Sequence, residues 1–397
     1  MTIPLSLKGT RTVRLDRKNF LATTGAAAAG AAFGFPAIVG AAPEPIRIGT
    51  IPCLTGSNAL LGQQEHDGAL LAVEEINKRK DKVYGGRPFE IVEEDATNDN
   101  QSAVSALNKL LGENVVAIVC PVLSTQVQAM APVMKTHEIP WMTGGTAVKN
   151  TQLGVPGMFR LRGSDGITAA GMTNFAVKDK KGKKIAIMHA SDAFGTGGAD
   201  QIVMNLKKMG MEPVANEQYP KDAKDFTAEI LKIKQANPDV LLMYIQNPSD
   251  TAVILKQINS LGLKVPIVGS PSLGNQTAIE VAGKDAYGTY CALDFIVGFN
   301  SNVATHFLTA FYNKFHHLPD VGTGSGWVYD SFYMLADIYA KQKGTDPKQT
   351  IASLKSIKKW DGVLGTFSAD AEGNMIHSVS IGQNENGKLR LVKKVSG

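Results

Sequence analysis

Small polar residues follow two strand-like segments of this chain, and their types and spacing could bind an anion. Ser124 comes after the apolar run 115–121 and stands where the next helix is expected to begin. The segment 143–146, with the sequence Thr-Gly-Gly-Thr, ends a strand-like run that begins at Ile139. Backbone N–H groups at a helix N-terminus attract an anion, and a capping hydroxyl adds a donor. Either segment alone is typical of ordinary capping and turn glycines, but with the two together a carboxylate site and ordinary capping are equally compatible with the sequence.

Segments that resemble enzyme motifs depart from those motifs at decisive positions. The segment 195–197 (Gly-Thr-Gly) follows a strand and opens a helix, but Asp200 stands where a dinucleotide loop needs Gly or Ala. The segment 382–388 has phosphate-loop spacing, but Leu389 replaces the Mg²⁺-binding hydroxyl, and Asn-Gly at 386–387 indicates a hairpin turn. The sequence has no nucleophile elbow and no metal-ligand spacing. We therefore expect no catalytic residue, no cofactor and no metal.

Most of the formal charge of +5 lies in the first 42 residues. Their net charge of +4 leaves +1 for the other 355 residues, so no broad basic face is available and a nucleic-acid partner is excluded. A basic stretch ending in Arg17-Lys18 precedes an Ala/Gly-rich apolar run, 22–40, and small residues at 39–42. We expect residues 1–42 to be a twin-arginine-like export signal, with the general secretory route still open, and the mature protein to be periplasmic.

The three cysteines lie in or beside apolar strand-like runs, which is typical of buried free thiols. Cys53 and Cys120 end two strands that we expect to be neighbours, so a disulfide between them stays an alternative if their Cα atoms are close. Cys291 has no such neighbour.

Strand-like and helix-like segments alternate along the rest of the chain, which is typical of parallel sheets covered by helices on both faces. We expect strands near 46–52, 89–92, 115–119 and 139–143, and a second series near 184–188, 212–215, 240–245 and 265–268. A helix over 326–342 carries an aromatic stripe that we assign to the core. Short β-like pieces at 363–367, 377–381 and 389–394 are expected to complete the two lobes, which requires several chain crossings.

In this order and spacing, the motifs of the chain resemble those of the periplasmic solute-binding proteins of branched-chain amino acid and amide ABC importers. The resemblance covers nearly the whole chain after residue 42, and it rests on 48–56, Gly62, 68–77, 95–99, 121–124, 159–165, 192–200 and 238–240. It implies the type I periplasmic-binding fold, an α/β architecture of two doubly wound parallel-sheet lobes joined by a three-crossing hinge. The N-terminal lobe would comprise 45–163 plus 296–369 and the C-terminal lobe 164–295 plus 370–397, with crossings near 161–164, 293–297 and 367–371.

The resemblance also implies the site residues. The hydroxyls of Ser124 and Thr146 would donate to a ligand carboxylate, with backbone groups of Gly144 and Thr146 assisting. Leu61 would close the site from the first lobe, and the second lobe would contribute Phe194, Asn247 and Pro271.

Pro271 stands where amino-acid binders of this family usually carry an acidic residue that accepts the α-ammonium group. Proline cannot accept it, and an unpaired ammonium in a closed cleft costs several kcal/mol. We therefore predict a small carboxylate or amide without a free α-ammonium, with an apolar or aromatic tail. The alternative is an amino acid whose ammonium is held by Asp192, Asp250 or Asp294.

The resemblance implies a solute-binding subunit that closes on a small-molecule ligand and delivers it to the membrane subunits of an ABC permease. We expect a monomer that catalyses no reaction. A ligand sensor of the same fold, which signals to a partner, is the alternative function.

Overall fold

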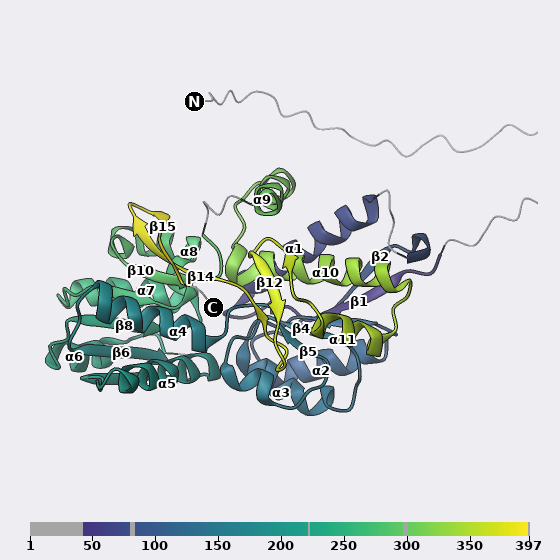
Figure 1. Cartoon of the computed structure of the whole chain (residues 1–397). Helices are drawn as coiled ribbons and strands as arrows, with labels where there is room; N and C mark the ends of the chain where they lie inside the picture. The colour runs from purple at the N-terminus through teal and green to yellow at the C-terminus, as the bar shows by residue number, and fades with distance from the viewer. Residues whose placement is uncertain (1–42, 80–83, 221–222, 297–300, 396–397) are drawn as a thin grey trace, which may run out of the picture. The chain divides into compact units, whose positions relative to one another are not determined.

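The computed structural model describes residues 43–79, 84–220, 223–296 and 301–395, which form one compact unit. The predicted export signal, residues 1–42, lies outside these described residues. Two large sheets of mainly parallel strands, with helices on both faces, dominate the fold (Figure 1). The predicted pair of doubly wound α/β lobes is therefore confirmed.

The first sheet has the strand order β2-β1-β3-β4-β5, and all its strands are parallel. Helices α1 and α10 lie on one side of it and α2 and α3 on the other (Figure 1). The strands are β1 (Ile46–Thr50), β2 (Phe89–Glu93), β3 (Ala117–Val119), β4 (Trp141–Thr143) and β5 (Met158–Arg160). The helices are α1 (Ala59–Lys78), α2 (Asn100–Leu111), α3 (Ser124–Met134), α9 (Asn302–Phe315), α10 (Gly326–Gln342) and α11 (Pro347–Lys355).

The second sheet has the order β15-β14-β10-β9-β8-β6-β7, and its last two strands in sequence pair antiparallel at one edge. Asn386 and Gly387 connect those two strands with positive φ angles of 53° and 85°, so the predicted hairpin turn is confirmed. The strands are β6 (Ile185–Ala190), β7 (Ala215–Tyr219), β8 (Val240–Tyr244), β9 (Ile267–Gly269), β10 (Tyr290–Leu293), β14 (Val379–Glu385) and β15 (Lys388–Val395).

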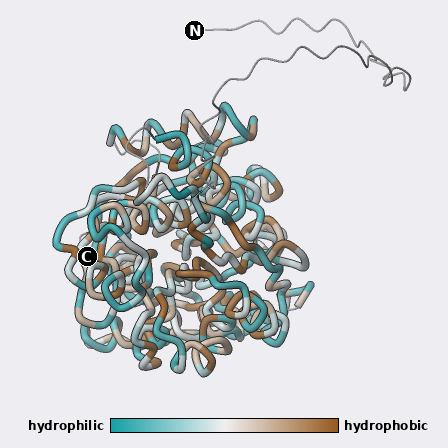
Figure 2. The backbone as a smooth tube through the Cα atoms, turned by 90° about the vertical axis from the view of Figure 1, so that its right-hand side faces the viewer, coloured by the Kyte–Doolittle hydropathy of each residue, from teal (hydrophilic) through white to brown (hydrophobic). Residues whose placement is uncertain are grey.

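Alternate side chains of β6 pack on opposite faces of this second sheet. Ile185 and Ile187 pack in one apolar cluster with α4 and α5, whereas Ala186 and Met188 pack in another with α6, α7 and α8. In Figure 2 hydrophobic stretches accordingly run through the interior of the compact unit. The helices are α4 (Asp165–Asn174), α5 (Ala193–Lys208), α6 (Thr227–Gln235), α7 (Pro248–Ser260) and α8 (Gln276–Ala282).

The C-terminal β segments, which were expected to complete the two lobes, do not all join the two main sheets. Strands β14 and β15 extend the second sheet, but β12 (Thr366–Ala369) forms a separate small sheet with β11 (Trp360–Asp361) and β13 (Met375–Ile376). A single bridge from Arg160 to Asn374 connects this small sheet to the end of β5. The pairing of β12 is antiparallel on both sides, and such local antiparallel pairing needs no crossover helix.

The aromatic stripe of α10 lies in the core of the first lobe, as predicted. Tyr329, Phe332 and Tyr339 are at most 3 % exposed and belong to its main hydrophobic cluster. The three cysteines are free and buried, which confirms the expectation of unpaired thiols.

Asp330 lies in the same helix and makes the stability of this lobe depend on pH. Its carboxylate accepts the backbone N–H groups of Val363 at 2.8 Å and Leu364 at 3.1 Å, but burial dominates and raises its pKa to about 7. The folded state therefore holds this proton more tightly than the unfolded chain, and the free energy of unfolding should fall as the pH rises from about 4 to 7. The expected fall is roughly 3–4 kcal/mol for this one group.

Comparing Asp330→Asn with the unsubstituted protein by urea denaturation at several pH values tests this expectation. Asparagine does not titrate, so the variant should lose less stability than the parent over this interval. Equal slopes of unfolding free energy against pH in the two proteins would contradict the assignment.

Candidate functional site

A narrow pocket lies at the carboxyl ends of the two main sheets, where α1, α5 and α7 begin. Ligands of open parallel sheets bind at this edge because strand ends and helix N-termini meet there. Both lobes supply its lining: Leu61, Val122, Arg162 and Thr323 on the side of the first sheet, and Phe194, Ile245, Gln246, Pro248, Pro271, Ser272 and Asn275 on the side of the second. Its free volume is ≈ 10 Å³, enough for about one water molecule.

Two further pockets share lining residues with this one and form a single cleft with it. The larger has a volume of ≈ 160 Å³ and shares Leu61 and Pro248, and the smaller, of ≈ 40 Å³, shares Gln246. Asn247 lines both of these neighbouring pockets. We call the pocket with Phe194 and Pro271 the inner pocket.

Phe194 reaches the inner pocket from the first turn of α5. Asp192 caps this helix by accepting the backbone N–H of Gly195 at 2.6 Å, which starts the helix directly after β6. The Phe194 ring packs on the buried ring of Tyr244, with centroids 4.7 Å apart. Gly198 allows this packing, because a Cβ there would lie 2.1 Å from the Tyr244 ring.

Pro271 is held in the inner pocket by a rigid loop after β9. The hydroxyls of Ser270 and Ser272, which flank it, donate to the carbonyl of Ile245 at 2.8 and 2.7 Å. Thr251 then donates to Ser272 Oγ at 3.0 Å. The proline therefore begins the short helix Pro271–Gly274 (η4) in a fixed position.

Three polar residues of the inner pocket already donate their side-chain hydrogen bonds to the protein. The Ser272 hydroxyl binds Ile245, as described above. Asn275 donates from Nδ2 to Asp320 Oδ2 at 2.7 Å, and the Thr323 hydroxyl donates to the same oxygen. The Asn275–Asp320 bond also joins η4 and α8 of the second lobe to the π-helical segment Val321–Ser325 (η6) before α10.

Arg162 and Asp294 form a buried ion pair beside the inner pocket. Both side chains are 3 % exposed, and Asp294 Oδ2 accepts from Nε and Nη2 of Arg162 at 3.1 and 2.9 Å. Asp294 Oδ1 accepts the Gly163 N–H at 2.7 Å and lies 3.4 Å from Nε2 of His377. Burial alone would raise the pKa of Asp294, but the charge of Arg162 and the contact with His377 together hold it at about 2.

The structure brings Leu61, Phe194 and Pro271 together around the inner pocket, with Asn247 in the adjoining compartments. Ser124, Gly144 and Thr146 are not among the residues that line these three pockets.

These three residues make contacts within the first lobe. The Ser124 hydroxyl oxygen accepts the backbone N–H of Ala147 at 3.1 Å, and the Thr146 carbonyl accepts Nη1 of Arg160 at 3.0 Å. The Gly144 N–H donates to the carbonyl of Pro121 at 3.2 Å.

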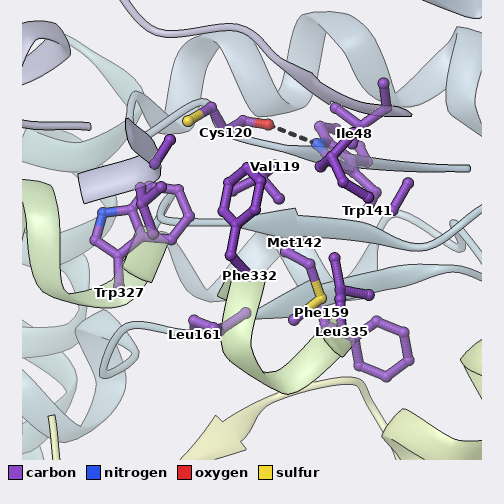
Figure 3. Close-up of a cluster of buried hydrophobic side chains, with 14 of the residues drawn as sticks. Ile48, Val119, Cys120, Trp141, Met142, Phe159, Leu161, Trp327, Phe332 and Leu335 are labelled. Atoms are coloured by element: carbon purple, nitrogen blue, oxygen red, sulfur yellow. Dashed lines mark hydrogen bonds between the residues drawn. The ribbon is translucent and has the colours of Figure 1, made fainter. Parts of the chain in front are cut away.

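Trp327 occupies the space next to Gly144. A Cβ on Gly144 would lie 2.7 Å from the indole ring, which is fully buried in the core of the first lobe. Figure 3 shows this ring beside Phe332 and near Cys120, whose carbonyl accepts from the Trp141 indole at 2.9 Å. The tryptophan belongs to the predicted aromatic helix, but its position against the Thr-Gly-Gly-Thr segment depends on the tertiary fold.

Sequence reasoning missed five polar or charged lining residues: Arg162, Gln246, Ser272, Asn275 and Thr323. One of them had a signal, since Arg162 comes two residues after the end of β5 at Arg160, close to the edge of the sheet where ligands bind. Thr323 had none, because η6 reaches the cleft through its packing on α1, α10 and η4, which depends on the tertiary structure.

The described residues contain no cluster of three or more His, Cys, Asp or Glu side chains that could hold a metal ion. Within the same ranges, no helix is both long and apolar enough to cross a bilayer.

The chain is similar to known proteins over most of its length. The sequence profile of a family described as "Periplasmic binding protein" matches residues 45–388. A "Leu/Ile/Val-binding protein homolog 3" from Brucella melitensis is 30 % identical over 259 residues, which cover 64 % of this chain and 70 % of that protein.

Solved structures share the fold. A branched-chain amino acid transporter substrate binding protein from Streptococcus pneumoniae, in complex with isoleucine, aligns with a TM-score of 0.79 at 24 % identity and covers 88 % of this chain and 100 % of its own. A solute binding protein from R. palustris, in complex with 4-hydroxybenzoate, aligns with a TM-score of 0.81 at 22 % identity and covers 89 % and 97 %.

Proposed function

This chain belongs to the periplasmic binding protein family, and we propose that it captures a small carboxylate in its interlobe cleft and delivers it to the membrane subunits of an ABC importer. Members of this family bind solutes and are not enzymes. We further propose that the protein works as a periplasmic monomer, with the lobe boundaries and the export signal predicted above.

The observation that carries the ligand class is the composition of the inner pocket. Six of its eleven lining residues are apolar, Leu61, Phe194 and Pro271 among them, and its described lining includes no Asp or Glu. An α-ammonium group there would lose its water without gaining a carboxylate partner, which is costly. An acid with an apolar or aromatic tail avoids that cost.

The chemistry of related proteins is compatible with this proposal. One structural neighbour holds 4-hydroxybenzoate, an acid without an ammonium group, and another holds isoleucine. Asp192 and Asp250 line the adjoining ≈ 40 Å³ compartment, so an amino acid is the alternative that the experiment must separate.

Thermal unfolding of the purified protein with L-leucine, 4-methylpentanoate and 4-hydroxybenzoate tests the ligand class. A ligand present at 100 times its dissociation constant stabilises the folded state by about 2.7 kcal/mol, which raises the midpoint temperature measurably. We expect at least one of the two acids without an ammonium group to stabilise the protein more than L-leucine does. Stabilisation by L-leucine alone would contradict the ligand class, and sustained conversion of a bound solute would contradict the binding function itself.

Delivery to a permease is tested in cells. Uptake of the stabilising solute should fall when the gene for this chain is deleted and recover when the gene is restored. Unchanged uptake would contradict an importer role and favour the sensor alternative.

A further inference from the structure

Arg162 is the single charged residue among those that line the inner pocket. It follows β5, where the chain leaves the first sheet, and its side chain is 3 % exposed. A buried cation beside a largely apolar pocket is costly unless it is paired, and Asp294 pairs with it here.

The hydrogen bonds around the pocket leave Arg162 as its available charged donor. The hydroxyls of Ser272 and Thr323 and one amide N–H of Asn275 are already bound within the protein. The other side-chain donors of the lining, on Asn275 and Gln246, are neutral amides. Arg162 uses Nε and Nη2 on Asp294, whereas its Nη1 makes no hydrogen bond to any residue in the described part of the chain. A guanidinium presents a planar fork of N–H groups that can serve a second carboxylate beside the first.

Glu65 does not compete for this second position. It lies one turn after Leu61 on α1, is 1 % exposed, and is close enough for the charge of Arg162 to act on it. Burial nevertheless raises the pKa of Glu65 well above its usual value, which favours the neutral form of the side chain. In its neutral form Glu65 does not compete with a ligand carboxylate for the Arg162 guanidinium.

Building on the proposed function, we infer that Arg162 is the residue that binds the ligand carboxylate, and that Asp294 is a positioning residue that holds the guanidinium toward the inner pocket. The anchor then lies between the carboxyl end of β5 and the apolar wall formed by Leu61, Phe194 and Pro271. This anchor favours a carboxylate over the primary amide of the same shape. The amide NH₂ group is a hydrogen-bond donor and cannot accept from the N–H groups of Arg162, whereas both carboxylate oxygens can.

Isothermal titration of the purified protein with 4-methylpentanoate, 4-hydroxybenzoate and the matching primary amides tests this inference. We expect the preferred acid to bind about 100-fold more tightly than its amide, since charged hydrogen bonds are made with one and not the other. In Arg162→Gln/Asp294→Asn, which removes both charges together, that preference should collapse to about threefold while the affinity for the amide stays nearly constant.

Two further variants make the result specific. Arg162→Lys keeps the charge and the ion pair but loses the planar fork of N–H groups, so acid binding should weaken about tenfold. This variant keeps the inference testable if the double variant folds poorly. The pair Arg79–Asp337 is another Arg–Asp ion pair, outside the inner pocket, with side chains 28 % and 34 % exposed. The same exchange there, Arg79→Gln/Asp337→Asn, should leave the preference for the acid unchanged.

Several outcomes would overturn the inference. They are a double variant that retains the preference for the acid, an Arg162→Lys variant that binds acids like the parent, and a parent protein that binds only the amides or that only L-leucine stabilises in the thermal-unfolding experiment. In this last case the protein still binds a solute, so the binding function survives while the Arg162 anchor fails. A parent protein that binds no probe of either kind contradicts both.

Discussion

Replacing Trp327 by alanine is expected to lower the free energy of unfolding by about 3–5 kcal/mol, the range typical of a large aromatic side chain removed from a packed core. The indole is fully buried, its Nε1 donates to the carbonyl of Thr323 at 3.3 Å, and its ring packs against Gly144. Removing it leaves a cavity between α10 and the loop after β4, which the sheet on one side cannot fill. Urea denaturation followed by far-UV circular dichroism measures the loss.

Trp360→Ala is the matched control for this prediction. Trp360 is half-buried, and its indole donates to Asp337 at 3.0 Å, so the same truncation there should cost clearly less. Equal losses in the two variants would contradict the assignment of Trp327 to the packed core.

A double-substitution cycle tests the contact between Trp327 and Gly144 directly. Gly144→Ala places a methyl group 2.7 Å from the indole and should cost about 1–3 kcal/mol in the parent protein. In the Trp327→Ala background the same methyl group meets open space, so its cost should largely disappear. Additive losses would show that the two residues do not touch.

Arg162→Gln alone is expected to destabilise the protein by about 3–5 kcal/mol, because it leaves the buried carboxylate of Asp294 without its cation. Arg162→Gln/Asp294→Asn should be within about 1–2 kcal/mol of the parent, since no unpaired charge remains and the Oδ1 of the introduced asparagine can still accept the Gly163 N–H. Urea denaturation of the parent, the single variant and the double variant at pH 7 gives both differences. A double variant as unstable as the single one would contradict the ion-pair explanation.

The ion pair also predicts a pH dependence opposite to that of Asp330. The pKa of Asp294 is lowered to about 2, below the value of about 3.9 for an unfolded aspartate, so its stabilising contribution is present above pH 4 and is lost as the pH falls toward 2. Asp330 acts between about pH 4 and 7, where its contribution falls as the pH rises. The two intervals do not overlap, so substitutions at each position should change the stability profile in different pH ranges.

The architecture was largely accessible from the sequence because its signals are local. Buried parallel strands are short continuous apolar runs, and the apolar residues of surface helices recur every 3.6 residues. The alternation of strands and helices can therefore be recognised without knowledge of the tertiary contacts. The turn at Asn386 and Gly387 was predictable for the same reason, since two adjacent residues determine a tight hairpin. Leu61, Phe194 and Pro271 were expected at the site because of the resemblance to the solute-binding proteins, and the three residues line one pocket.

Contacts between residues distant in sequence were decided by the tertiary structure alone. Arg162 and Asp294 are 132 positions apart, and the hydrogen bond between Asp320 and Asn275 joins segments 45 positions apart. In both pairs, the sequence around one residue does not indicate its partner, because a charged residue is most often a solvated surface residue.

The sequence by itself therefore determined the fold class, the family and the edge of the sheets at which a ligand would bind. Only the tertiary structure placed Trp327 against Gly144 and brought Arg162 to the inner pocket. The physical reason is that secondary structure follows from hydrophobic periodicity within a short window, whereas a binding site depends on which distant side chains fill the space between elements.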